Sequence, residues 1–120
     1  IPYPKKLKEN IVRNNLKLLN GILPSFDMQI KKSENRGDLV SINHRVTEFL
    51  ASYFDIIFAV NEMTHPGEKR MQSICSKECS ILPNNFDENL NRLFEGMFRK
   101  NISSVISDIV DEIKKITEMQ

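Results

Sequence analysis

The fold is decided by residues 49–60, which read FLASYFDIIFAV. From Leu39 onward, apolar residues recur mostly at intervals of three and four, the period of an amphipathic helix. Residues 56–60 are apolar on every side of such a helix, which indicates that other helices surround it. We therefore predict a long central helix from about Asp38 to Met63, with Asp38 as its N-terminal cap.

Helical periodicity also covers most of the remaining chain, and the alternation typical of β-strands is nowhere sustained. Ser25 is placed to cap a short helix, and the polar run 31–37 is either a solvated helix end or a loop, with Gly37 as the expected C-terminal stop. Proline fits the first turn of a helix, so Pro66 predicts the start of another. The other segments with a helical period are residues 4–23, 66–80, 86–98 and 102–119. The chain is predicted to be all-α, a single helical bundle of about five helices around the long central one.

Composition restricts the class of protein. The 120 residues are 40% apolar, enough for one domain whose core needs no disulfides. The 17 basic and 16 acidic residues nearly cancel, so no overall charge attracts nucleic acid or an anionic membrane. Cys75 and Cys79 are too few for a disulfide scaffold, and no apolar run approaches membrane-spanning length. These features predict a soluble, cytoplasmic protein with reduced thiols.

Residues 61–70, NEMTHPGEKR, gather chemically capable side chains at the end of the central helix. Lys69 and Arg70 near a helix N-terminus would form a pocket for phosphate or carboxylate. Glu62 or His65 would then be the proton acceptor for a hydroxyl held there. The alternative is that His65 caps a helix and the charged residues are solvated. The spacing alone leaves both interpretations open.

Asp55 is a carboxylate inside the most apolar helix, so it must be paired or face a cleft. An ion pair with an arginine is predicted. The candidate partners are Arg13, Arg45, Arg92 and Arg99. A metal site is not expected, because the histidines and cysteines have no recognised ligand spacing and structural zinc needs four converging ligands.

Motifs of a self-contained reaction centre are missing from the chain. Magnesium-dependent nucleotidyl transfer needs a Gly-Ser turn and paired Asp-x-Asp carboxylates. In this chain no glycine precedes a serine, and no two carboxylates have that alternating spacing. There is also no phosphate-binding loop and no nucleophile elbow. The chain begins at Ile1 rather than at a methionine, so we expect it to be a piece of a longer protein.

The central helix ends in Phe58-Ala59-Val60-Asn61 and is followed by Pro66 and then by Lys69-Arg70. In this pattern the chain resembles the carboxy-terminal helical domain of bacterial nucleotidyltransferase-like proteins. That uncharacterised family is similar in layout to the aminoglycoside nucleotidyltransferases. The pair Arg36 and Asp38 matches a charged element that often precedes this helix. The resemblance covers about half of the chain.

The resemblance implies a division of labour between two domains. An amino-terminal α/β catalytic domain would bind magnesium and a nucleoside triphosphate, so this chain would hold no cofactor itself. The helical domain would pack against that domain, wall its cleft and bind a small-molecule acceptor. The residues implied to line the cleft are Asn61, His65, Glu68, Lys69 and Arg70, together with Arg36 and Asp38.

A second hypothesis, from a different class, is a helical interaction or regulatory bundle without a small-molecule site. It predicts that residues 61–70 are fully solvated and that exposed apolar residues form a homodimer patch. The isoleucines of the segment 102–119 are candidates for this patch.

Overall fold

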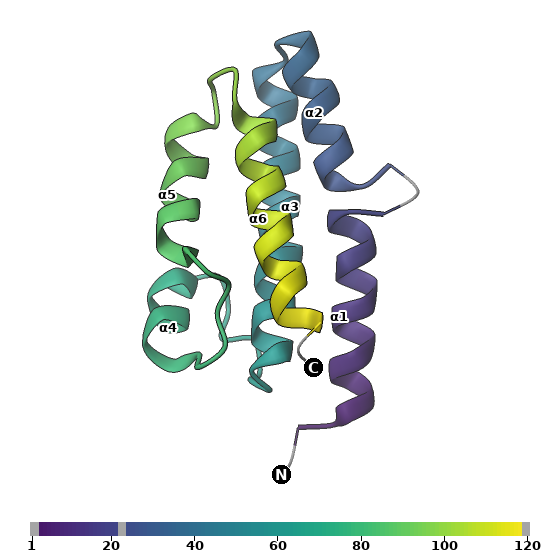
Figure 1. Ribbon diagram of the computed structural model, residues 1–120, viewed down its shortest axis with the longest axis vertical. Helices are drawn as coiled ribbons and strands as arrows, with labels where there is room; N and C mark the ends of the chain where they lie inside the picture. Colours follow the sequence, from purple (N-terminus) through teal and green to yellow (C-terminus); the bar gives the residue numbers. More distant parts are fainter. Residues whose placement is uncertain (1–2, 22–23, 119–120) are drawn as a thin grey trace.

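The computed structural model describes residues 3–21 and 24–118, and helices are its regular elements (Figure 1). They are α1 (Lys5–Leu19), α2 (Phe26–Arg36), α3 (Leu39–Val60), α4 (Met71–Glu78), α5 (Phe86–Gly96) and α6 (Ile102–Glu118). The prediction of an all-α bundle around a long central helix is confirmed for these residues.

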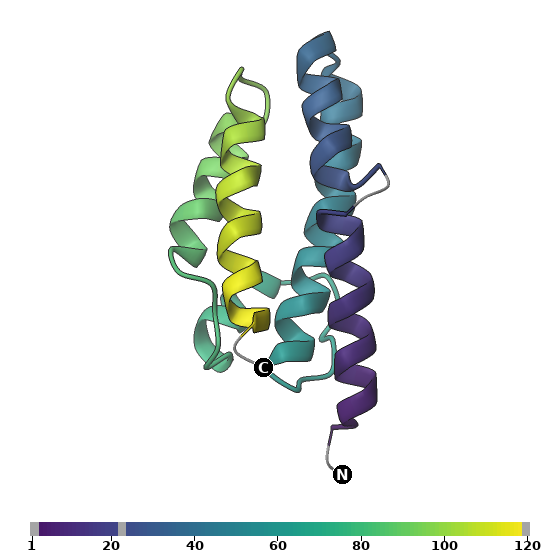
Figure 2. The same cartoon turned by 45° about the vertical axis from the view of Figure 1, so that its right-hand side comes forward.

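The helices form two layers, one of α1, α2 and α3 and the other of α4, α5 and α6 (Figures 1 and 2). In the first layer α1 and α2 follow one another along α3 and run antiparallel to it. In the second, α5 and α6 are antiparallel neighbours, and α6 packs against α2 and α3. The start of α1 and the end of α3 therefore lie at the same end of the bundle.

The helix count is six instead of about five, because the polar run 31–37 continues the helix that begins after Ser25. Most of this run is exposed, so it is the solvated helix end that the sequence allowed, but Ser33 and Glu34 contact neighbouring helices. The buried Ser33 hydroxyl lies 2.7 Å from that of Ser41, and Glu34 Oε2 accepts a hydrogen bond from the Ser103 N–H at 2.7 Å. Gly37 ends α2 in the left-handed conformation at a φ of 66°, as predicted.

Helix α3 begins where the sequence predicts, because the Asp38 side chain accepts a hydrogen bond from the Ser41 N–H at 3.2 Å. Its aromatic side chains form the centre of the core. Tyr53 stacks on Phe49 and on Phe86, each with ring centroids 6.3 Å apart. Burial of these rings removes most of their apolar surface from water, the main favourable term in folding.

Residues 63–70 are not helical, so the prediction of a helix starting at Pro66 is wrong. Gly67 and Arg70 both have left-handed backbones, with φ values of 96° and 58°. Left-handed residues cannot continue a right-handed helix, and α4 begins only after Arg70. Pro66 therefore lies in an irregular connection between α3 and α4.

Helix α1 ends at Leu19, short of its predicted end, because Asn20 has an extended backbone with a φ of −155°. The predicted extension of this segment to Leu23 lies outside the described residues, as does the predicted end of the last helix at Met119.

The isoleucines of α6 face the core, which is a correction to their expected place in a dimer patch. The buried ones are Ile102, Ile106, Ile109, Ile113 and Ile116.

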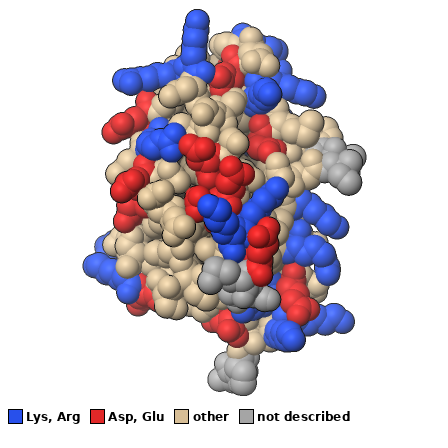
Figure 3. All heavy atoms as spheres, viewed as in Figure 1, with Lys and Arg blue, Asp and Glu red and all other residues tan. Residues whose placement is uncertain are grey.

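Charge on the surface is mixed. The face shown in Figure 3 has basic and acidic side chains interspersed, in line with the formal net charge of +1. Among the described helices, none combines the length and the apolar character needed to cross a bilayer.

Candidate functional site

The turn that follows α3 is fixed by the side chain of Asn61. Its Nδ2 donates to the carbonyl oxygens of Ile57 and Ile81, each at 2.8 Å, and its Oδ1 accepts from the Ile81 N–H at 2.9 Å. These bonds tie the end of α3 to the segment after α4, twenty residues along the chain. Asn61, which the resemblance places on the cleft, therefore positions the turn.

Glu62 has a left-handed backbone, with a φ of 56°, and its side chain is 54% exposed. The carboxylate lies 3.7 Å from the Lys8 ammonium at the start of α1. Glu62 is thus a surface carboxylate that links the end of α3 to the start of α1.

His65 lies opposite Asp55, with 3.6 Å between His65 Nε2 and Asp55 Oδ1. Its other ring nitrogen, Nδ1, accepts a hydrogen bond from the Gly67 N–H at 3.0 Å. The imidazole packs edge-on against Phe58, with ring centroids 5.2 Å apart. Asp55 is therefore paired, but with the histidine of the following turn instead of an arginine. Among the expected partners, Arg45 pairs with Glu48 and Arg92 pairs with Asp108.

A cavity of about 200 Å³ opens beside this pair, between α1 and the C-terminal half of α3. Its lining residues are Tyr3, Ile11, Asn15, Asp55, Phe58, Ala59, Met63 and His65. Sites for drug-sized ligands span roughly 300–1,000 Å³, so this cavity accommodates a small fragment or one part of a larger ligand. The sequence analysis missed Tyr3 and Asn15, and the only signal for Asn15 was a polar side chain beside the apolar stripe of its helix.

Glu68, Lys69 and Arg70 are exposed and follow His65 on the surface. Neither Lys69 nor Arg70 forms an ion pair with a residue that the structure describes, and neither lines the cavity beside His65. Both immediately precede α4, whose first N–H groups have no intrahelical acceptor. An anion bound there would be approached from solvent or from a second domain.

Arg36 and Asp38 lie at the opposite end of α3. The 22 residues of this helix span roughly 33 Å. Asp38 caps α3 and lies 3.5 Å from the Arg36 guanidinium, so both have structural partners. Asn61, Glu62, His65, Glu68, Lys69 and Arg70 thus share the connection between α3 and α4, whereas Arg36 and Asp38 lie at the other end of α3.

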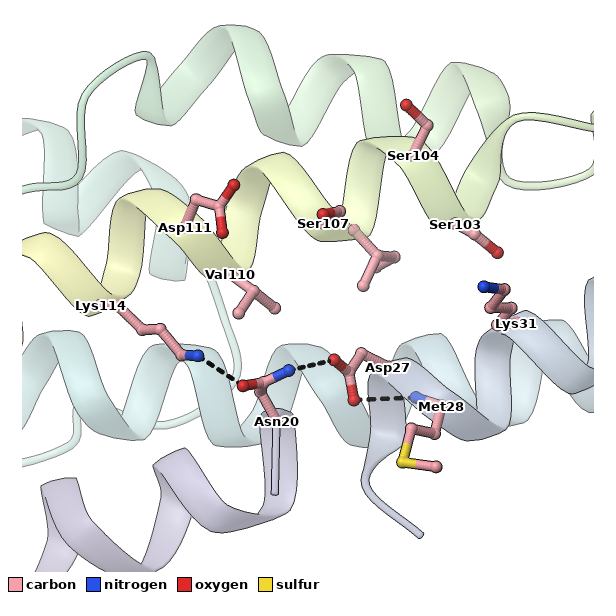
Figure 4. A pocket seen from close by; sticks show the side chains of 11 residues that line it. Asn20, Asp27, Met28, Lys31, Ser103, Ser104, Ser107, Val110, Asp111 and Lys114 are labelled. Atoms are coloured by element: carbon pink, nitrogen blue, oxygen red, sulfur yellow. Dashed lines mark hydrogen bonds between the residues drawn. The ribbon is translucent and has the colours of Figure 1, made fainter. Parts of the chain in front are cut away.

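A second cavity, of about 400 Å³, lies where α2 and α6 face each other (Figure 4). A hydrogen-bonded chain crosses one end of it: Lys114 Nζ donates to Asn20 Oδ1, and Asn20 Nδ2 donates to Asp27 Oδ2 at 2.6 Å. Asp27 also accepts from the Met28 N–H at 2.8 Å. This network joins the end of α1 to α2 and α6, and its polar groups have structural partners.

No group of three or more potential metal ligands occurs within residues 3–21 and 24–118. Cys75 and Cys79 are free and buried. Burial, with a smaller contribution from Cys79, raises the pKa of the Cys75 thiol to about 12, so it is protonated and unreactive near neutral pH.

Comparison of the chain with protein-family models finds no match, and comparisons with curated proteins and with solved structures find no significant match.

Proposed function

We propose that this chain is the helical substrate-binding domain of a nucleotidyltransferase, which walls the cleft of a metal-dependent catalytic domain. The observation that carries the proposal is the pair of exposed cations, Lys69 and Arg70, beside a turn that Asn61 holds in place. Flexible cations on a fixed turn are suited to contacting the phosphates of a nucleotide presented by another domain.

The arrangement of the bundle supports the same proposal. Tyr3 lines the cavity beside His65, and Lys8 pairs with Glu62 in the same region. A catalytic domain joined ahead of Tyr3 would therefore emerge beside the cavity, at the end of the bundle where α3 ends. In this arrangement magnesium and the nucleoside triphosphate belong to the catalytic domain, and the helical domain receives the small-molecule acceptor.

Of the two candidate bases, Glu62 is turned toward Lys8, whereas His65 lines the cavity. The cavity side chains are better placed to meet the acceptor. Lys69 and Arg70 would contact the nucleotide from outside the cavity. The nucleotide and the acceptor would then bind at separate places and meet at the interface of the two domains.

The test is nucleotide binding by the full-length parent protein with Lys69→Ala and Arg70→Ala combined. Loss of two charged contacts is expected to weaken binding of the magnesium complex of ATP, GTP, CTP or UTP by roughly tenfold or more in calorimetry. The melting temperature should not change, because both side chains are exposed.

The matched control combines Arg99→Ala with Lys100→Ala, an exposed cation pair between α5 and α6 at the other end of the bundle. This variant should bind the nucleotide as the unchanged protein does. Equal affinity and equal melting in the Lys69 and Arg70 variant would reject the proposed role.

A second candidate function, a helical interaction module, is favoured by one observation. Phe94 on α5 and Phe98 in the loop that follows it are 52% and 56% exposed. Exposed aromatic side chains are typical of contact surfaces between proteins. This candidate requires a dimer, which the substrate-binding domain does not.

A further inference from the structure

We propose that the cavity beside His65 is a subsite for a hydrogen-bond-donating group of the acceptor, a hydroxyl or an ammonium. Asp55 and Asn15 would receive this group, and His65 would position Asp55 instead of acting as a base. The inference rests on the proposed function, because it assigns the acceptor to this cavity.

The position of Asp55 is the first argument. It is the one charged residue in the stretch 49–60, and its neighbours Phe54 and Ile56 are buried. A carboxylate on such a helix costs stability unless it is paired or solvated. Its side chain is 45% exposed and lines the cavity, so an entering group can reach it.

The hydrogen bonding of His65 is the second argument. Because Nδ1 accepts from the Gly67 N–H, the proton of the neutral ring is on Nε2, and Nε2 faces Asp55. The Nδ1 lone pair is thus occupied and Nε2 carries the proton, so the neutral ring offers no lone pair to a ligand. The imidazole is further held in place by Phe58. His65 is therefore built to orient the carboxylate.

The other polar residues that line the cavity, Asn15 and Tyr3, also favour a hydrogen-bond donor as the ligand. Asn15 donates its Nδ2 proton to the Ile11 carbonyl oxygen at 2.9 Å, and its Oδ1 accepts no hydrogen bond from a described residue. Burial raises the pKa of the Tyr3 hydroxyl, so this group stays neutral. The cavity thus presents a carboxylate and an amide oxygen beside the neutral Tyr3 hydroxyl, which disfavours anions and favours donors.

The volume limits the part of the ligand that enters. At about 200 Å³, the cavity accommodates one functional group or a small ring. The rest of an acceptor would extend toward the exposed cations of the turn.

The first experiment titrates the 120-residue chain with glycerol, ethylammonium or acetate and follows amide shifts by NMR. Saturable shifts of the cavity residues are expected with glycerol or with ethylammonium, and the two arms distinguish a hydroxyl from an ammonium ligand. Asp55→Asn should weaken that binding roughly tenfold, the factor for one charged hydrogen bond. The control Glu48→Gln, at a carboxylate on α3 that pairs with His44 and Arg45 away from the cavity, should leave binding unchanged.

The second experiment tests the positioning role of His65. Long-range proton–nitrogen correlations should show the Nε2–H tautomer in the neutral ring. His65→Gln retains a donor toward Asp55 and should bind the probe within about twofold of the unchanged chain, whereas His65→Phe keeps the ring but should weaken binding roughly tenfold.

Three outcomes would overturn the inference. They are binding of acetate at the same site, unchanged affinity of the Asp55→Asn variant for the probe, and observation of the Nδ1–H tautomer in the neutral ring of His65. Absence of saturable binding by both donors would also overturn it. These measurements involve neither a nucleotide nor the cations Lys69 and Arg70, so their failure is distinguishable from failure of the proposed function.

Discussion

Asn61 and His65 show how single residues acquire roles from distant neighbours. Asn61 belongs to the motif that suggests a binding cleft, yet its amide is used in holding Ile81. His65 lies in a segment rich in charge, yet its ring is fixed by Gly67 and Asp55. At this scale the type of side chain determines which hydrogen bonds and charges are possible. Its partners in the fold determine which of its donors and acceptors are still available to a ligand.

Cys75 gives a prediction at the residue scale. Because its pKa is raised from 9.0 to about 12, the thiol should react with iodoacetamide far more slowly in the native chain at pH 8.5 than in urea. Below pH 9 the thiol is protonated in both folded and unfolded states. Between pH 9 and pH 12 only the unfolded state ionises, so the free energy of unfolding should fall as the pH rises.

Denaturant titrations at several pH values measure this slope. The Cys75→Ala variant should show a shallower decrease between pH 9 and pH 11. Burial also raises the pKa of Tyr53, so a Tyr53→Phe variant separates the two contributions. Alkylation of native Cys75 at the rate found in urea would contradict the prediction.

At the scale of elements, helix boundaries follow local chemistry where a cap is strong. Gly37 and Asp38 end α2 and start α3 where the sequence predicts, because a left-handed glycine and a capping carboxylate act within a few residues. The start of α4 does not follow Pro66, since the path of residues 63–70 depends on contacts with α3. Local sequence signals thus predicted the helix caps at Gly37 and Asp38 correctly but did not predict the path of residues 63–70.

The cap of α3 gives a prediction at this scale. Asp38→Ala should lower the free energy of unfolding by about 1 kcal/mol, because the Ser41 N–H loses its acceptor. Asp38→Asn should retain most of the stability, since asparagine caps equally well. Chemical denaturation measures both values. An equal loss in the two variants would instead assign the effect to the ion pair with Arg36.

The whole molecule brings the start of α1, the end of α3 and the turn at residues 61–70 to one end of the bundle. The apolar side chains of α6 are used in joining the two layers, so they are not available for a partner. The exposed aromatic residues Phe94 and Phe98 lie on α5 and the loop that follows it. The two candidate functions therefore make use of different parts of the surface.

The oligomeric state gives a prediction at the scale of the molecule. A phenylalanine buries roughly 150–250 Å², so two half-exposed rings offer on the order of 200 Å². A stable interface needs about 800 Å² from each partner. Light scattering should therefore return the mass of a monomer, 13.9 kDa. Twice this mass, reversed by Phe94→Ser with Phe98→Ser, would favour the interaction module.

The sequence by itself determined the helical class, the start of α3 and the caps at Gly37 and Asp38, since each depends on residues a few positions apart; α3 ends at Val60, before its predicted end at Met63. It also marked Asp55 as a charge that needs a partner, without naming the partner. Only the tertiary structure decided that this partner is His65. It also decided that Arg36 and Asp38 lie a helix length away from the turn. Periodicity defines which face of a helix is apolar, but packing between helices sets the distances on which a binding site depends.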